Sequence, residues 1–146
     1  MPLEKFDISF PVEFSGVTYS VHGRIRPYHE AFLKRVSEIF EVVVFTASQK
    51  IYADKVLNII DPEHKYIKYR LFRDSCLVIT GNYLKDLSVL GRDLAKTIIV
   101  DNSPQAFGYH LSNGIPILSW YDNYQDTELL KVLEFLEKIV NVDDVR

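Results

Sequence analysis

The chain has 146 residues, of which 47% are hydrophobic and 25% charged, and its formal net charge at pH 7 is −3. These values predict one soluble domain over residues 1–146 and give no reason to expect nucleic acid or an anionic membrane as a partner. The single cysteine excludes an intrachain disulfide, no apolar stretch approaches the ~20 residues of a membrane helix, and the first residues lack signal-peptide character. We therefore expect an intracellular protein.

The first elements are predicted to be a β-hairpin and a helix. Two β-prone stretches flank "FSG" within residues 6–27, and Pro11 favours an edge position. Pro27 suits the first turn of a helix over residues 28–40. Apolar side chains recur near one face of that helix: Tyr28, Phe32, Val36, Ile39 and Phe40.

Short apolar runs and helical segments alternate in the rest of the chain. The runs "VVVF", "TIIV" and "GIPIL" are predicted to be strands, and residues 68–80 are predicted to form two short strands joined around Asp74 and Ser75. Residues 81–96 look polar and irregular. Helices are predicted over 49–61, over a short segment that Pro104 opens and Gly114 follows, and from Asp126 or Thr127 onward, where four residues share one side: Leu129, Leu133, Leu136 and Val140.

This alternation predicts an α/β fold with a mainly parallel sheet, helices on both faces and small hairpin insertions. Such sheets bind ligands beyond the carboxyl ends of their strands. Thr46, Asp101 and Asn102 each follow or end an apolar strand, so we expect them to share one crevice.

These residue types suit magnesium and phosphate. Asp101 and Asn102 offer the hard oxygen ligands that Mg²⁺ takes. The Thr46 hydroxyl can hold a phosphate oxygen, and a lysine such as Lys85 can neutralise charge on a transferring phosphoryl group. From the residues alone, the alternatives are a turn opened by the Asp-Asn pair, a buried strand that ends at Thr46, and a solvated Lys85.

Five segments resemble one family: "VVVFTAS", "YADKVLNIIDP", "RLFRDSC", "GNYLKDLSVLGRDLAKTIIVDNSPQAF" and "SNGIPILSWYDNYQDTELLKVLEFLE". They are similar to the small phosphatases that act on the C-terminal domain of RNA polymerase II, within the haloacid dehalogenase superfamily, and to the small phosphatase-like 2 group among them. The resemblance runs from about Phe10 to the C-terminus. It implies a magnesium-dependent aspartyl-phosphate mechanism on phosphoserine or phosphothreonine in proteins, and a nuclear location.

The resemblance also implies a role for each matching residue. Thr46 would bind the phosphoryl group, and Lys85 would steady both the phosphate and the acidic cluster. Asn102 would be a metal ligand, and Asp101 would act on the metal directly or through the lysine. Two further residues match positions near the substrate groove: Tyr52 and Arg73.

The sequence departs from the family at the nucleophile. The family opens with a central strand that ends in Asp-x-Asp, and these 146 residues contain no Asp-x-Asp; Asp7 is a poor substitute. We therefore expect a truncated or short form without turnover, in which the strands ending at Thr46 and Asp101 close up, accept a strand from elsewhere, or leave the chain unstable. The alternatives are a non-catalytic module that binds phosphorylated or acidic peptide and, less favoured, a phospho-receiver domain.

Overall fold

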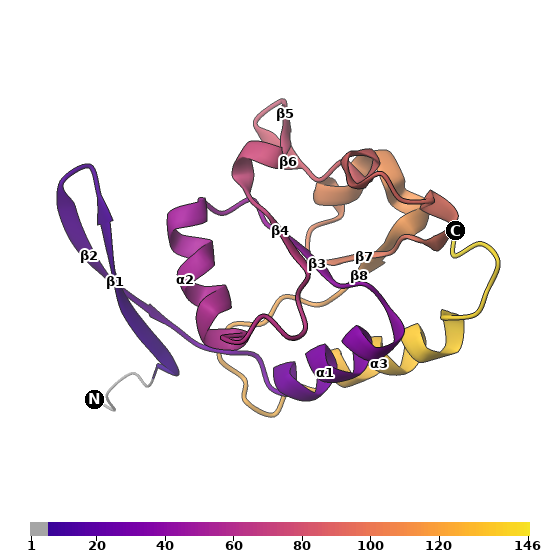
Figure 1. The fold of residues 1–146 in the computed structure, drawn as a ribbon, viewed down its shortest axis with the longest axis horizontal. Helices are drawn as coiled ribbons and strands as arrows, with labels where there is room; N and C mark the ends of the chain where they lie inside the picture. Colours follow the sequence, from indigo (N-terminus) through magenta and orange to yellow (C-terminus); the bar gives the residue numbers. More distant parts are fainter. Residues whose placement is uncertain (1–5) are drawn as a thin grey trace.

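The computed structural model describes residues 6–146 and has an α/β fold (Figure 1). Its α-helices are α1 (His29–Ile39), α2 (Lys50–Ile60) and α3 (Glu128–Ile139). Its strands are β1 (Ile8–Phe14), β2 (Val17–Gly23), β3 (Val43–Phe45), β4 (Tyr69–Leu71), β5 (Leu77–Ile79), β6 (Asn82–Leu84), β7 (Ile99–Asp101) and β8 (Gly114–Pro116). Short 3₁₀ helices complete it: η1 (Arg73–Ser75), η2 (Leu87–Leu90), η3 (Leu94–Lys96) and η4 (Pro104–Asn113).

The parallel strands form two separate pairs. β3 pairs with β4, with Val43 opposite Tyr69, and β7 pairs with β8, with Ile99 opposite Gly114. Within the described residues β3 and β7 have no other strand partner. The predicted α/β class is confirmed, and the parallel sheet is divided in the middle, where the resemblance implied that a central strand is missing.

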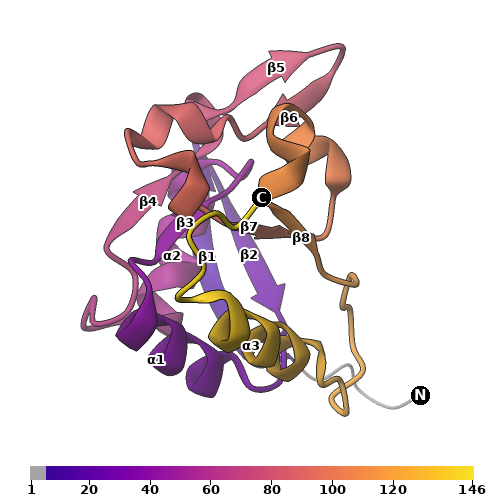
Figure 2. The ribbon, with the colours of Figure 1, turned by 90° about the vertical axis from the view of Figure 1, so that its right-hand side faces the viewer.

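Two antiparallel hairpins project from this body (Figures 1 and 2). In β1–β2 the turn residues are Ser15 and Gly16, with φ of 52° and 77°; in β5–β6 they are Thr80 and Gly81, with the same two values. Positive φ at both central residues is typical of the two-residue turns whose twist matches the flanking strands. The hairpin around "FSG" is confirmed, whereas β6 lies in a segment predicted to be irregular.

Helices α1 and α3 pack together against one face of the parallel pairs (Figure 2). Val36 of α1 and Val132 and Leu136 of α3 are buried there against apolar side chains that include Val42 and Val100. These contacts join the amphipathic faces of two helices that are far apart in sequence. None of the helices in residues 6–146 is long and apolar enough to cross a bilayer.

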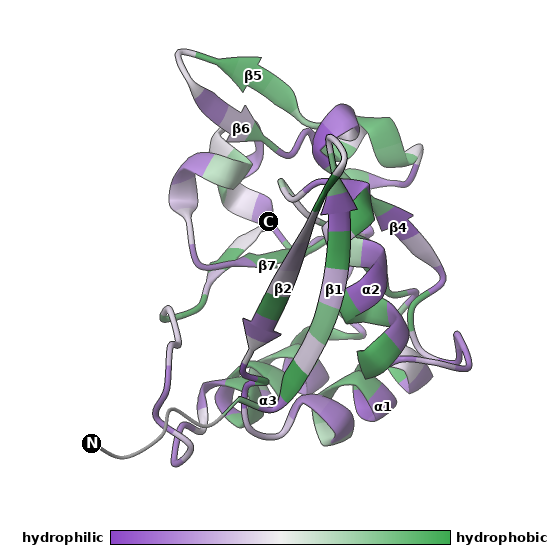
Figure 3. Cartoon of the chain, turned by 90° about the vertical axis from the view of Figure 1, so that its left-hand side faces the viewer, coloured by the Kyte–Doolittle hydropathy of each residue, from purple (hydrophilic) through white to green (hydrophobic). Residues whose placement is uncertain are grey.

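The opposite face of β7 is covered by the short helices. Ile99 packs with Leu87 of η2 and Phe107 of η4, and all three are buried. On the other side of the molecule α2 packs against β1, and Figure 3 shows the hairpin β1–β2 lying across it. The predicted helices on both faces of the sheet are therefore present, although those over β7 are 3₁₀ helices.

One detail of the predicted helices is wrong, and an alternative left open at the last helix is resolved. Pro27 lies before α1 rather than in its first turn, because Tyr28 adopts a left-handed conformation (φ 69°) at the N-cap and is exposed. At the start of α3 the Thr127 side chain makes no capping bond, whereas Asp126 accepts a hydrogen bond from the Glu128 N–H (3.4 Å).

Candidate functional site

The polar residues at the end of β3 are held by local hydrogen bonds. Thr46 follows β3, and its hydroxyl oxygen accepts the Ser48 N–H at 3.0 Å. The Arg73 guanidinium donates from Nε to the Ala47 carbonyl at 2.6 Å and lies 4.9 Å from the centre of the Tyr83 ring. Arg73 therefore links the loop after Thr46 to hairpin β5–β6, and it forms no ion pair with a carboxylate in residues 6–146.

At the end of β7, Asp101 forms an ion pair with Lys85, and both side chains are largely buried. The other Asp101 oxygen accepts the Ser103 N–H at 2.9 Å, and the Lys85 N–H donates to the Ala106 carbonyl at 2.7 Å. The ammonium and the carboxylate therefore sit in fixed positions, which suits a site that must not reorganise when charge develops.

Asn102 lies beside this pair. Its amide nitrogen donates to the Ser119 hydroxyl at 3.1 Å, which leaves its amide oxygen for another partner. The carboxylate of Asp101 and the amide oxygen of Asn102 fit a hard cation such as Mg²⁺, which keeps several waters and needs few protein ligands. No group of three or more His, Cys, Asp or Glu side chains within residues 6–146 forms a larger metal cluster.

Cys76 lies between the two halves of the site. Its Sγ is 3.8 Å from the Thr46 carbonyl, and it feels the charges of Lys85, Arg73 and Asp101. Burial raises the pKa of the Cys76 thiol, although the neighbouring cations oppose that rise. The thiol is therefore not activated as a nucleophile.

Tyr52 stands apart from these residues. It lies in the first turn of α2, is 39% exposed, and places its ring 6.0 Å from that of Phe10 on β1. The structure therefore places Cys76 and Arg73 against the loop after β3, pairs Lys85 with Asp101 at the end of β7 next to Asn102, and puts Tyr52 at the hairpin side.

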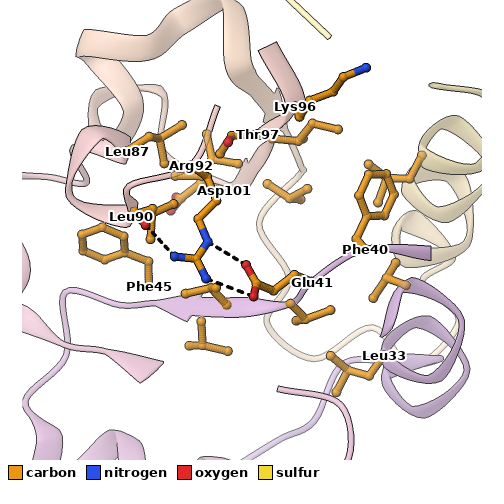
Figure 4. Close-up of a pocket in the computed structure, with 18 of the residues that line it drawn as sticks. Leu33, Phe40, Glu41, Phe45, Leu87, Leu90, Arg92, Lys96, Thr97 and Asp101 are labelled. Atoms are coloured by element: carbon orange, nitrogen blue, oxygen red, sulfur yellow. Dashed lines mark hydrogen bonds and ion pairs between the residues drawn. The ribbon is translucent and has the colours of Figure 1, made fainter. Parts of the chain in front are cut away.

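A cavity of about 460 Å³ separates the two strand pairs, and we call it the β3–β7 slot (Figure 4). Residues 43–45 form one wall and residues 98–100 the other. Side chains from α1, α3 and η2 close its two faces with apolar groups: Phe32, Val36, Leu136, Leu87 and Leu90. The two strands have therefore not closed up on each other.

The backbone of both walls faces the slot. The Val42 carbonyl and the Thr46 N–H both bond to the β4 segment, at 2.9 Å each. Successive residues of a strand direct their N–H and C=O groups to opposite sides, so those of Val43 and Phe45 point into the slot. On the other wall the Asp101 carbonyl accepts a hydrogen bond from the β8 side at 3.1 Å. The same alternation turns the amide groups of residues 98 and 100 toward the slot.

The fold and these residues define an α/β protein with a polar site at the carboxyl ends of parallel strands. A family model described as NLI interacting factor-like phosphatase matches residues 1–146. The CTD small phosphatase-like protein 2 of Dictyostelium discoideum is 58% identical over 145 residues, which are 99% of this chain and 25% of that protein. The chain belongs to the NLI interacting factor-like phosphatase family.

Two other similar proteins also have small phosphatase names. CTD small phosphatase-like protein 3 of Caenorhabditis elegans is 50% identical over 99% of this chain and 51% of its own length. The human carboxy-terminal domain RNA polymerase II polypeptide A small phosphatase 1 is 46% identical over 99% of this chain and 55% of its own length. The chain thus spans between a quarter and about half of these proteins.

A solved structure supports the fold. That of Fcp1, an essential RNA polymerase II CTD phosphatase, matches with a TM-score of 0.69 at 23% identity, over 92% of this chain and 40% of that chain. The haloacid dehalogenase-like fold expected from the sequence is confirmed.

Sequence reasoning missed the residues that anchor the site. Ser48 and Ser119 orient Thr46 and Asn102, and Tyr83 lies under Arg73. The bond to the Ser48 N–H was detectable, since a threonine hydroxyl after a strand commonly accepts the backbone N–H two residues further on. Ser119 and Tyr83 carried no such signal, because their contacts are made through tertiary structure.

Proposed function

We propose that this chain forms most of a Mg²⁺-dependent protein serine/threonine phosphatase domain for phosphopeptides of the RNA polymerase II C-terminal-domain type. The observation that carries the proposal is the largely buried Lys85–Asp101 ion pair at the carboxyl end of β7, while Thr46 follows the carboxyl end of β3. The names of relatives up to 58% identical support the reaction and the substrate class. A nuclear location follows from that substrate and belongs to the same proposal.

Each residue has a role that its contacts support. The Thr46 hydroxyl, fixed by the Ser48 N–H, donates its proton to a phosphoryl oxygen. Lys85 neutralises charge on the phosphate, and the Asp101 carboxylate keeps its ammonium in place. Arg73, which has no carboxylate partner within residues 6–146, binds a phosphate or the peptide beside it, and Tyr52 contacts the peptide further out.

The metal would be held by Asp101 and Asn102. When bound, Mg²⁺ would offset the negative charge that builds up on the phosphoryl oxygens. The protein supplies one carboxylate oxygen of Asp101 and the amide oxygen of Asn102, and Ser119 orients the Asn102 amide.

The nucleophile comes from outside the described residues. A phosphatase of this type must transfer phosphorus to a carboxylate. The β3–β7 slot has unsatisfied backbone groups on both walls, apolar faces, and a carboxyl end beside Lys85. A further strand that runs parallel to β3 and β7 would place a carboxylate at its end next to Thr46 and Lys85, which we propose bind the phosphoryl group.

The test separates binding from turnover. We expect the 146-residue chain to bind phosphoserine in ³¹P NMR titrations, more tightly with Mg²⁺, and Thr46→Val to weaken binding. We expect no hydrolysis of p-nitrophenyl phosphate until a synthetic apolar peptide ending in Asp-x-Asp is added. The same peptide with Asn-x-Asn is the control, and it should bind without restoring turnover.

Two results would contradict the proposal. Phosphate release by the chain alone that Lys85→Met abolishes would place the nucleophile within these residues. Absence of phosphoserine binding would show that Thr46, Arg73 and Lys85 do not form a phosphate-binding site. Binding without turnover in the presence of every Asp-x-Asp peptide would favour the second candidate, a non-catalytic phosphopeptide-binding module, which the lack of Asp-x-Asp in the sequence supports.

A further inference from the structure

The outer strand of hairpin β5–β6 lacks the features that usually protect the edge of a sheet. Leu77, Val78 and Ile79 of β5 are 42%, 59% and 36% exposed, and β5 carries no charged residue and no proline. Within residues 6–146 only β6 pairs with β5, and Figure 2 shows β5 as the outer strand. Soluble proteins usually protect such edges with lysine, proline or a covering segment, because a free edge accepts other strands.

The register shows which backbone groups are free. Ile79 is opposite Asn82 across a two-residue turn, and such a turn is closed by a hydrogen-bonded pair. The amide groups of Ile79 and Leu77 therefore point to β6. By alternation, the N–H and C=O of Val78 point to the free edge.

The hairpin is attached to the candidate site at both ends. Arg73 lies just before β5, and Lys85 follows the last residue of β6. The Arg73 guanidinium covers the ring of Tyr83, and Tyr83 is directly opposite Val78, so these side chains share one face of the hairpin. A continuous surface thus runs from an arginine without a carboxylate partner in the described residues to an exposed valine.

We infer that β5 is a docking edge for the extended segment of a phosphoprotein next to its phosphorylated residue. The phosphate lies by Lys85 and Arg73, and the flanking segment pairs with β5 through the Val78 N–H and C=O. This mode of binding gains affinity from the main chain and specificity from alternate side chains. The inference rests on the proposed phosphoryl site, and it names the substrate class: phosphorylated segments with β-branched or apolar neighbours and no proline at the paired positions.

The test removes one hydrogen-bond donor. Val78→Pro deletes the outward N–H and leaves the β6 pairing intact. The matched control is Glu13→Pro, because Glu13 is opposite Thr18, next to the closing pair of Phe14 and Val17, and holds the same position in hairpin β1–β2. Val78→Ala keeps the amide and removes only the side chain.

The probes are two fluorescent peptides with the same short valine-isoleucine segment before or after phosphoserine. We expect Val78→Pro to weaken one of them by about three- to tenfold, as for the loss of one hydrogen bond, with Glu13→Pro unchanged. N-methylation of that peptide should weaken binding at the one amide that donates to the Val78 carbonyl, and it should do so on both the unaltered chain and Val78→Pro, because proline keeps that carbonyl.

The outcomes separate the two proposals. If Val78→Pro binds both peptides as tightly as the unaltered chain, or if N-methylation weakens binding at no position, the docking edge is wrong while the phosphoryl site stands. If free phosphoserine does not bind the unaltered chain, the proposed function fails. If phosphoserine binds and neither peptide binds more tightly than phosphoserine, the docking edge alone is overturned.

Discussion

Arg92 and Glu41 both line the β3–β7 slot and form an ion pair there (Figure 4). The guanidinium donates from Nε and Nη2 to the two Glu41 carboxylate oxygens, at 2.8 and 3.0 Å. Its Nη1 donates to the Leu90 carbonyl at 2.8 Å, and its Cζ lies 5.6 Å from the centre of the Tyr69 ring. One side chain thus connects the loop between η2 and η3 with the starts of β3 and β4.

Replacing Arg92 with Met should lower the urea midpoint of unfolding without changing the m-value, because the bidentate bond is lost but no core group is exposed. The loss should shrink at high salt, which screens exposed charges. The double variant Glu41→Arg/Arg92→Glu should recover part of the midpoint. A midpoint that is equal in all variants at low salt would show that this pair does not stabilise the contact between the η2–η3 loop and β3.

Gly114→Ala should be strongly destabilising. A Cβ there would lie 2.2 to 2.8 Å from three ring atoms of buried Phe107, and neither β8 nor the ring can move freely. We expect a loss of about 3 kcal/mol in the free energy of unfolding. Gly108→Ala is the control: its Cβ would meet only the Leu84 Cδ2, at 3.3 Å, and should cost less than about 1 kcal/mol. Equal losses would contradict the packing of Phe107.

Asp61 is 2% exposed and accepts the N–H groups of Lys65, Tyr66 and Ile67 at 2.9, 3.1 and 3.0 Å. Burial favours the neutral acid, but these three bonds bring the pKa of Asp61 below its usual value. Asp61→Ala should cost about 3 kcal/mol in urea unfolding, because buried donors lose their acceptor. Asp61→Asn keeps one acceptor oxygen and should cost less; the reverse order would contradict this account.

Asp86 should make stability depend on acid pH. The hydrogen bond from His110 (2.9 Å), followed by those from Ser88, lowers the pKa of Asp86 from 3.8 to about 2. A carboxyl with a lower pKa in the folded state stabilises the fold above 3.8, and that contribution is lost as pH falls toward 2. Because the group is partly solvated, we expect ~1 kcal/mol.

Urea unfolding of Asp86→Asn and the unaltered chain between neutral pH and about pH 3 measures this effect. The difference in the free energy of unfolding between the two proteins should be constant at neutral pH and should become smaller in acid. A gap that widens as pH falls would show that Asp86 ionisation does not stabilise the fold.

Local patterns predicted most elements but not how the strands are grouped. Runs such as "VVVF" and "TIIV" fit strands between packed layers, and the amphipathic spacing in α1 and α3 predicted the Val36 and Leu136 contacts. β6 was missed because its three residues, "NYL", are too short to show an alternation. The divided sheet was expected only through the resemblance, in which the absent strand is central, because strand pairing is not contained in any local window of sequence.

The sequence alone predicted only those site residues that lie directly at the ends of strands. Thr46 and Asp101 follow from the carboxyl-end rule for parallel strands. The Lys85–Asp101 pair was expected only through the resemblance, because their sixteen-residue separation crosses an irregular segment. The role of Arg73 as a link to Ala47, and the position of Cys76 between the halves, required the folded chain.

The two strand pairs also imply an order of assembly. Each pair is closed within a short length of chain, residues 43–71 for one and 99–116 for the other, so each forms with a small loss of loop entropy. The contact between α1 and α3 spans almost the whole sequence and must come late. The protein should therefore behave as two cooperative units joined by a slower docking step, and amide hydrogen exchange should report a separate opening free energy for each.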